Sequence, residues 1–193
     1  DDDVIGNLGE MDLENAVGVR HVGYKRVSEL QSTSHVYIEK AKEVFRKSKS
    51  FFYPNEEREF YEFYVCNDLV PRKNIIYYDG SSHMHDPEKV IKNVTARRLV
   101  VDHGRFTVIV GTGGLGKSMM MRHLMLDALK TYSEDNKVLP AFVILKDYNP
   151  EKASLLEYIF SQIEQYNWNM ELSDLTEMMK QGNVLLLLDG LDE

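Results

Sequence analysis

The chain has 193 residues, 43% of them apolar, which is enough for one domain with a buried core and part of another. Its 31 acidic residues outnumber the 23 basic ones, and the formal net charge of −8 argues against a nucleic-acid-binding surface, which needs clustered Lys and Arg. The single cysteine, Cys66, excludes an intrachain disulfide, and no apolar run approaches the roughly 20 residues of a membrane span, so we expect a cytoplasmic protein without a membrane partner.

The first half of the chain carries weak and mixed structural signals. Residues 1–15 contain six acidic side chains and no basic one, which predicts a disordered, solvated end. In residues 16–99, apolar side chains recur at helical spacing from about residue 36 to 52 and predict a helix there. Residues 60–65 and 74–78 are aromatic and β-branched and predict two short strands, which could pair with one another.

A second helix is predicted just before the middle of the chain. Asp86, Pro87 and Glu88 follow the pattern of an N-cap, a first helical position and an acidic first turn, so we expect a helix to about Arg98. No residue of the 16–99 region points to a chemistry. This region is either a packing collar for the domain after it or the tail of an effector module.

From about residue 100 the pattern changes to one of alternating strands and helices. Short apolar runs at 106–110, 141–145 and 184–188 predict strands, and the segments 117–132, 155–166 and 172–180 predict helices. Apolar strands that alternate with helices are typical of an α/β fold with a parallel sheet covered on both faces. We therefore place a domain over residues 100–193.

A phosphate-binding loop joins the first of these strands to the helix after it. Its sequence is Gly111-Thr112-Gly113-Gly114-Leu115-Gly116-Lys117-Ser118, which fits the Walker A pattern G-x-x-x-x-G-K-[ST]. Glycines let the backbone curl until successive N–H groups point at phosphate oxygens, and the helix adds its positive N-terminal end. We expect Lys117 to reach the β- and γ-phosphates and Ser118 to ligate Mg²⁺.

A second motif ends the sequence. The apolar run Leu185–Leu188 leads to Asp189, at the carboxyl end of a strand, where open α/β sheets bind their ligands. A carboxylate there can hold Mg²⁺, usually through water. Two further acids, Asp192 and Glu193, offer a general base for an attacking water, and we favour Glu193 over Asp192.

Together the two motifs resemble the NACHT family of STAND-type P-loop NTPases. Asp189, Gly190, Leu191, Asp192 and Glu193 match the family's Walker B pattern position by position. The resemblance covers residues 100–193 and implies a three-layer P-loop sandwich with a parallel sheet. It also implies ATP or ADP with Mg²⁺, and a switch that couples nucleotide state to self-association in innate immune signalling or antiphage defence.

The resemblance also implies that a strand from beyond the Walker B motif lies between the two motif-bearing strands. We therefore expect an incomplete sheet with a gap or an unusual pairing there, poor order near residues 191–193, and negligible turnover by residues 1–193 alone. In the longer protein we expect an ATPase. The alternatives are an ordinary P-loop ATPase or kinase whose purpose is turnover, and a non-catalytic nucleotide-binding scaffold.

Overall fold

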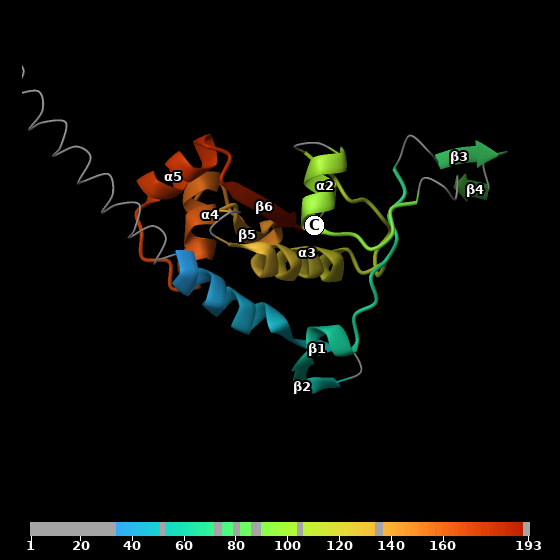
Figure 1. Cartoon of the computed structure of the whole chain (residues 1–193), viewed down its shortest axis with the longest axis horizontal. Coiled ribbons are helices and arrows are strands. Elements are labelled where there is room, and N and C mark those ends of the chain that lie inside the picture. Colours follow the sequence, from blue (N-terminus) through green and yellow to red (C-terminus); the bar gives the residue numbers. More distant parts are fainter. Residues whose placement is uncertain are drawn as a thin grey trace, which may run out of the picture.

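The computed structural model describes residues 34–50, 53–71, 75–78, 82–85, 90–103, 106–133 and 137–190. Its centre is a parallel pair of strands, β5 (Leu139–Ile144) and β6 (Val184–Asp189), with Leu139 opposite Val184 and Ile144 opposite Asp189 (Figure 1). None of the described helices combines the length and apolar character that a bilayer span requires. The predicted α/β character and parallel pairing are confirmed for these two strands, whereas the three-layer arrangement stays a prediction.

Three helices accompany this pair. They are α3 (Lys117–Thr131), which contacts both strands, α4 (Leu155–Glu164), which contacts β5, and α5 (Leu172–Lys180), which contacts α4. A capping box opens α4, because the Ser154 hydroxyl accepts from the backbone N–H of Glu157 and the Glu157 carboxylate accepts from that of Ser154. A short 3-10 turn, η4 (Leu145–Asp147), follows β5. These three predicted helices and the second and third predicted strands are confirmed within two residues at every end.

The first predicted strand does not form. Residues 106–110 pair with neither β5 nor β6, and the side chains of Phe106, Val108 and Val110 are 88%, 71% and 73% exposed. A strand needs a neighbour to satisfy its backbone groups, and no described segment supplies one. The expected burial on both faces is therefore wrong for this segment, and the expected gap between two motif-bearing strands stays a prediction. Residues 191–193 lie outside the described residues.

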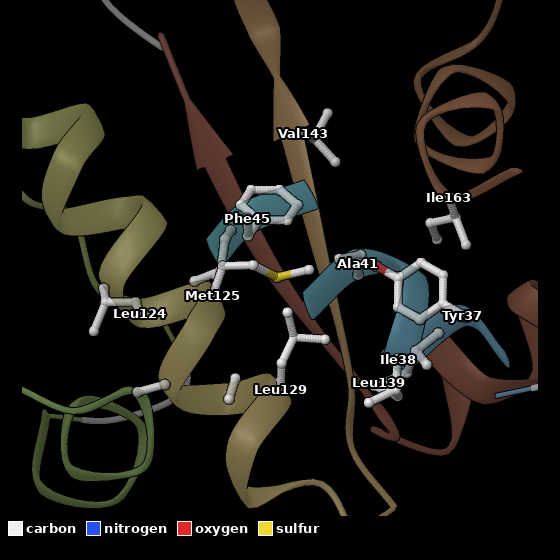
Figure 2. Close-up of a cluster of buried hydrophobic side chains, with 14 of the residues drawn as sticks. Tyr37, Ile38, Ala41, Phe45, Leu124, Met125, Leu129, Leu139, Val143 and Ile163 are labelled. Carbon is white, nitrogen blue, oxygen red and sulfur yellow. The ribbon is translucent and has the colours of Figure 1, made fainter. Parts of the chain in front are cut away.

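A helix from the N-terminal half completes the core. Residues 34–46 are helical, and Tyr37, Ile38, Ala41 and Phe45 on one face are buried against α3, β5 and α4 (Figure 2). The Tyr37 hydroxyl donates to the Pro140 carbonyl in β5 at 2.6 Å. This helix is part of the same core as the sheet.

The same helix ends earlier than its predicted end at residue 52. The next positions on its buried face are Ser48 and Lys49, which offer no apolar contact, and β1 (Lys47–Ser50) begins there as an antiparallel partner of β2 (Tyr53–Glu59). Arg122 of α3 is hydrogen-bonded to the end of this helix. Its guanidinium donates to the carbonyls of Phe45 and Val44, both at 2.9 Å, and to that of Lys47, which satisfies groups that a helix end leaves unpaired.

The remaining N-terminal elements differ from prediction in instructive ways. Residues 60–65 form no strand; they begin with the 3-10 turn η1 (Phe60–Glu62), because Phe60 and Tyr64, four residues apart, stack at 4.7 Å on one face of the turn. The strand predicted at 74–78 is present as β3 (Ile75–Tyr78), but it pairs with β4 (Ser82–His85) instead of residues 60–65. This β3–β4 hairpin lies away from the parallel pair (Figure 1).

The helix predicted to begin near Asp86 begins later. Ile91 forms a two-hydrogen-bond bridge with Leu69, and Asn93 has a left-handed φ of 50°, both incompatible with a continuous helix. α2 (Ala96–His103) starts only after Thr95, whose hydroxyl accepts from the Arg98 backbone N–H at 3.2 Å. Residues 86–89 lie outside the described residues, and the boundary that we proposed near residue 100 falls inside α2.

Candidate nucleotide site

The Walker A loop lies directly before α3, as predicted. Gly114 and Gly116 have φ values of 79° and 80°, in the left-handed region that glycine adopts without strain, and Gly116 is the N-cap of α3. The first turn of α3 carries no acidic side chain, so nothing there opposes an anion at the helix N-terminus. The loop residues Gly111–Leu115 are exposed. The backbone therefore has the form and the surroundings of an anion-binding loop.

The hydrogen-bond donors of this loop also favour the binding of an anion. Among the described residues, the N–H groups of Gly113, Gly114 and Gly116 find no protein acceptor. The Lys117 ammonium donates a hydrogen bond to the Gly111 carbonyl at 2.8 Å, so its positive charge lies beside the first residue of the loop. Unsatisfied N–H groups together with one ammonium are the donor set that a chain of phosphates satisfies.

The second motif meets the first. Asp189 is the last residue of β6, and its Oδ1 accepts a hydrogen bond from the Ser118 hydroxyl of α3 at 3.1 Å. The two residues are 71 positions apart, so only the packing of α3 against β6 brings them together. Both motifs therefore contribute to one site, at the carboxyl end of the parallel strands.

Gly190 explains why a small residue follows Asp189. Its φ is 80°, and a Cβ added there would lie 3.4 Å from the backbone nitrogen of Lys146 and 3.5 Å from its Cβ. A larger side chain would be strained by the backbone and crowded by the end of β5. The glycine thus lets the chain turn sharply once Asp189 has been placed beside Ser118.

The oxygen atoms of Ser118 and Asp189 fit Mg²⁺. Mg²⁺ takes six oxygen ligands at about 2.1 Å, so neighbouring ligands lie about 3 Å apart. The observed 3.1 Å between Ser118 Oγ and Asp189 Oδ1 matches that spacing, and a serine that donates its proton to a carboxylate keeps its lone pairs for a cation. The described residues contain no group of three or more His, Cys, Asp or Glu side chains placed to hold a metal, so the other ligands would be phosphate and water oxygens.

Asp192 and Glu193, the predicted general bases, lie outside the described residues. Of the predicted site, the structure therefore places residues 111–118 and Asp189 together. The two candidate bases stay predictions.

One contact at this site was not predicted. The side-chain amide of Asn67 donates to the Leu115 carbonyl within the Walker A loop at 2.8 Å. Nearby, Tyr64 stacks on His123 of α3 with 5.1 Å between ring centroids, and its hydroxyl donates to the Met120 sulfur at 3.4 Å. Burial raises the pKa of Tyr64, so this hydroxyl stays protonated at neutral pH. No sequence pattern connects Asn67 to a loop 48 residues away.

The comparisons with known proteins agree with this geometry. Residues 105–193 match the family model of the NACHT domain. Neither the curated proteins nor the solved structures give a match to the chain. The matched segment contains the Walker A loop, α3, the parallel pair and Asp189. Residues 105–193 are therefore similar to the NACHT domain, a family of nucleotide-binding P-loop NTPases.

Proposed function

We propose that the protein binds ATP or ADP with Mg²⁺ at the site formed by residues 111–118 and Asp189, and that nucleotide state controls its self-association in signalling. The observation that carries the nucleotide site is the 3.1 Å hydrogen bond between Ser118 and Asp189, which joins the phosphate loop to the acidic strand end. The match of residues 105–193 to the NACHT domain supports a nucleotide-controlled role.

In this proposal each group has a separate task. The backbone N–H groups of the loop and the Lys117 ammonium bind the phosphate oxygens, and the N-terminal end of α3 adds its positive potential. Ser118 and Asp189 would hold Mg²⁺, which when bound neutralises charge on the phosphates. Glu193, or in second place Asp192, would take a proton from the attacking water. The adenine base, rather than guanine, rests on the family alone.

Replacing Lys117 tests the binding site. Lys117→Ala should weaken MgATP binding by roughly 10–150-fold, the equivalent of one hydrogen bond to a charged group. Lys130→Ala is the matched control, because Lys130 is exposed in the last turn of the same helix. Isothermal calorimetry measures both, and equal affinity for wild type and Lys117→Ala would refute the site. Displacement of ATP by an equal concentration of GTP would refute the adenine preference.

The magnesium role has its own test. Asp189→Asn keeps the shape of the side chain and removes its charge, so the variant should lose affinity for ATP in the presence of Mg²⁺ and bind like wild type in EDTA. An equal loss of affinity under both conditions would assign Asp189 a structural role.

Turnover is tested by replacing the candidate bases. Because we expect negligible turnover by residues 1–193 alone, the test uses a chain that extends beyond residue 193. There Glu193→Gln should leave ATP affinity unchanged and lower the rate of hydrolysis by about 10²–10⁴-fold, the range for general-base catalysis. Asp192→Asn is the comparison. If it abolishes hydrolysis while Glu193→Gln does not, the two roles are reversed.

Self-association is tested separately by light scattering with ATP, with ADP and without nucleotide. A molecular mass that is the same under all three conditions contradicts the nucleotide-controlled switch.

A further inference from the structure

The hydrogen bond between Asn67 and the Walker A loop comes from outside the NACHT-matched segment. Asn67 Nδ2 donates to the Leu115 carbonyl at 2.8 Å, and a Cβ added at Gly116 would lie 3.5 Å from the same nitrogen. Residue 67 therefore lies directly against the peptide group that joins Leu115 to Gly116. The family match begins only at residue 105.

The geometry of that peptide gives the contact a consequence for phosphate binding. In a trans peptide the C=O and the N–H point in opposite directions, and the described chain has no cis peptide. When the Leu115 carbonyl is turned toward Asn67, the Gly116 N–H is turned to the opposite side. That N–H is one of the loop donors with no acceptor among the described residues.

The loop itself does not fix this orientation. Gly116 has a φ of 80°, and a glycine adopts positive and negative φ with similar ease. The Leu115–Gly116 peptide can therefore rotate at low energetic cost unless an outside group holds its carbonyl. Among the described residues the Asn67 amide is the side chain that bonds this carbonyl.

Asn67 is itself held at both sides. Three residues earlier, Tyr64 packs on His123 and Met120 of α3, the helix that begins at the loop. Two residues later, Leu69 makes the paired backbone bridge to Ile91, at 3.0 and 2.8 Å, and Ile91 is buried. The amide is thus presented from a segment that is fixed to the same helix as the loop.

We propose that Asn67 is a positioning residue of the nucleotide site: by holding the Leu115 carbonyl, it presents the Gly116 N–H to the phosphate chain. The proposal rests on the proposed function, because it concerns the same site. Asn67 touches no reacting atom. The ligand class of the site that it positions is any chain of two or more phosphates.

The test measures affinity of the full chain for MgATP and for inorganic tripolyphosphate. Asn67→Ala should weaken both by the same factor, about 2- to 10-fold, the equivalent of one ordinary hydrogen bond. Asn67→Asp, which keeps the shape but loses the donor, should lose at least as much. Asn67→Gln, which keeps an amide donor, should recover part of the loss. Val65→Ala in the same segment, whose side chain is 80% exposed, is the matched control and should bind like wild type.

Each outcome is decisive. A loss for ATP but not for tripolyphosphate would mean that Asn67 contacts the nucleoside, and would overturn the inference. So would equal losses in Asn67→Gln and Asn67→Ala, or a fall in melting temperature without nucleotide that Val65→Ala does not show, because either indicates a structural role. If Lys117→Ala loses affinity and Asn67→Ala does not, only the inference fails. If wild type binds neither ligand, both fail.

Discussion

Residues 34–103 and residues 117–190 are built in different ways. The second region contains the parallel pair and the helices that pack on it. The first contains local pieces, such as the β1–β2 and β3–β4 hairpins, that share no sheet with the second region. The buried face of the 34–46 helix belongs to the shared core. The other contacts between the two regions are single hydrogen bonds and ring contacts, and most of them reach the Walker A loop and the first three turns of α3.

These contacts come from six points in the N-terminal region. Asn67 bonds the Leu115 carbonyl, Tyr64 contacts Met120, the end of the 34–46 helix bonds Arg122, Tyr61 and the Val94 carbonyl bond His123, and the Ala96 N–H bonds Asp127. Residues 105–193 thus contain the proposed nucleotide site, while the region before them supports the helix at whose N-terminus that site lies. Substitutions at the junction test whether the two regions are one cooperative unit.

The largest effect is expected from removing the aromatic side chain that joins the 34–46 helix to the core. Tyr37 is fully buried and meets Tyr166 and Trp168 edge to face, at 5.8 and 6.0 Å between ring centroids. Tyr37→Ala should lower the free energy of unfolding by about 3–5 kcal/mol, because it leaves a large cavity. Urea unfolding monitored by circular dichroism measures this.

The neighbouring residue supplies the control for that experiment. Val36 is 48% exposed on the same helix, so Val36→Ala should change stability by less than about 0.5 kcal/mol. If Tyr37→Ala has an effect as small as Val36→Ala, the 34–46 helix is not part of the core and the two regions are separate units.

A smaller effect is expected from the contact between Arg122 and the helix end. The guanidinium bonds three carbonyls near the end of the 34–46 helix and lies 5.2 Å above the Phe45 ring, measured to the centroid. Arg122→Met keeps the length and apolar character of the side chain and removes the donors. It should cost about 2 kcal/mol, within the range for hydrogen bonds from a charged group.

Two further variants sharpen that result. Arg122→Lys should recover only part of the loss, because a single ammonium cannot copy the planar arrangement of guanidinium donors. Arg46→Met removes a surface ion pair with Glu59, at 3.2 Å, and should cost less than about 1 kcal/mol. Equal costs for Arg122→Met and Arg46→Met would show that Arg122 is no more than another surface charge.

The two regions also differ in how far sequence reasoning reached. α5 was predicted with its observed ends, and α3 within one residue, because their apolar spacing and their Gly, Ser and acidic start signals are local. The meeting of Ser118 and Asp189 was implied by two motifs of known partnership. Residues 106–110 look like a strand for the same local reason, but a strand also needs a neighbour.

In the N-terminal region the deciding forces are contacts between distant residues. Residues 60–65 have strand-like composition, yet they begin with a 3-10 turn, because Phe60 packs against the Arg122 guanidinium at 5.8 Å and Tyr64 contacts Met120, both in α3. The 34–46 helix stops where its apolar face ends and where Arg122 meets its carbonyls. Asn67 carries no local signal for its bond to Leu115. A single sequence does not state which distant partner a side chain will meet.

A smaller effect at neutral pH than that of Arg122→Met is expected from removing one oxygen atom, in Tyr37→Phe, which tests the same junction more finely. The variant loses the buried hydrogen bond to the Pro140 carbonyl, and this loss should lower the free energy of unfolding by about 1 kcal/mol at pH 7.

Burial, and in second place repulsion from Tyr166, raises the pKa of Tyr37 well above its ordinary value near 10. Below pH 10 the phenol is therefore protonated in both folded and unfolded chains, and its contribution to stability is fully present. Above pH 10 the unfolded chain releases this proton while the folded chain retains it, so stability falls by about 1.4 kcal/mol per pH unit for this group. Urea unfolding at pH 7, 10 and 11 should show a shallower alkaline loss for Tyr37→Phe than for wild type, so that the two stabilities converge. Every other titrating group is shared by the two proteins, so the difference between them reports on Tyr37 alone. If both proteins lose stability in parallel above pH 10, the Tyr37 phenol titrates in contact with water and is not buried between the two regions.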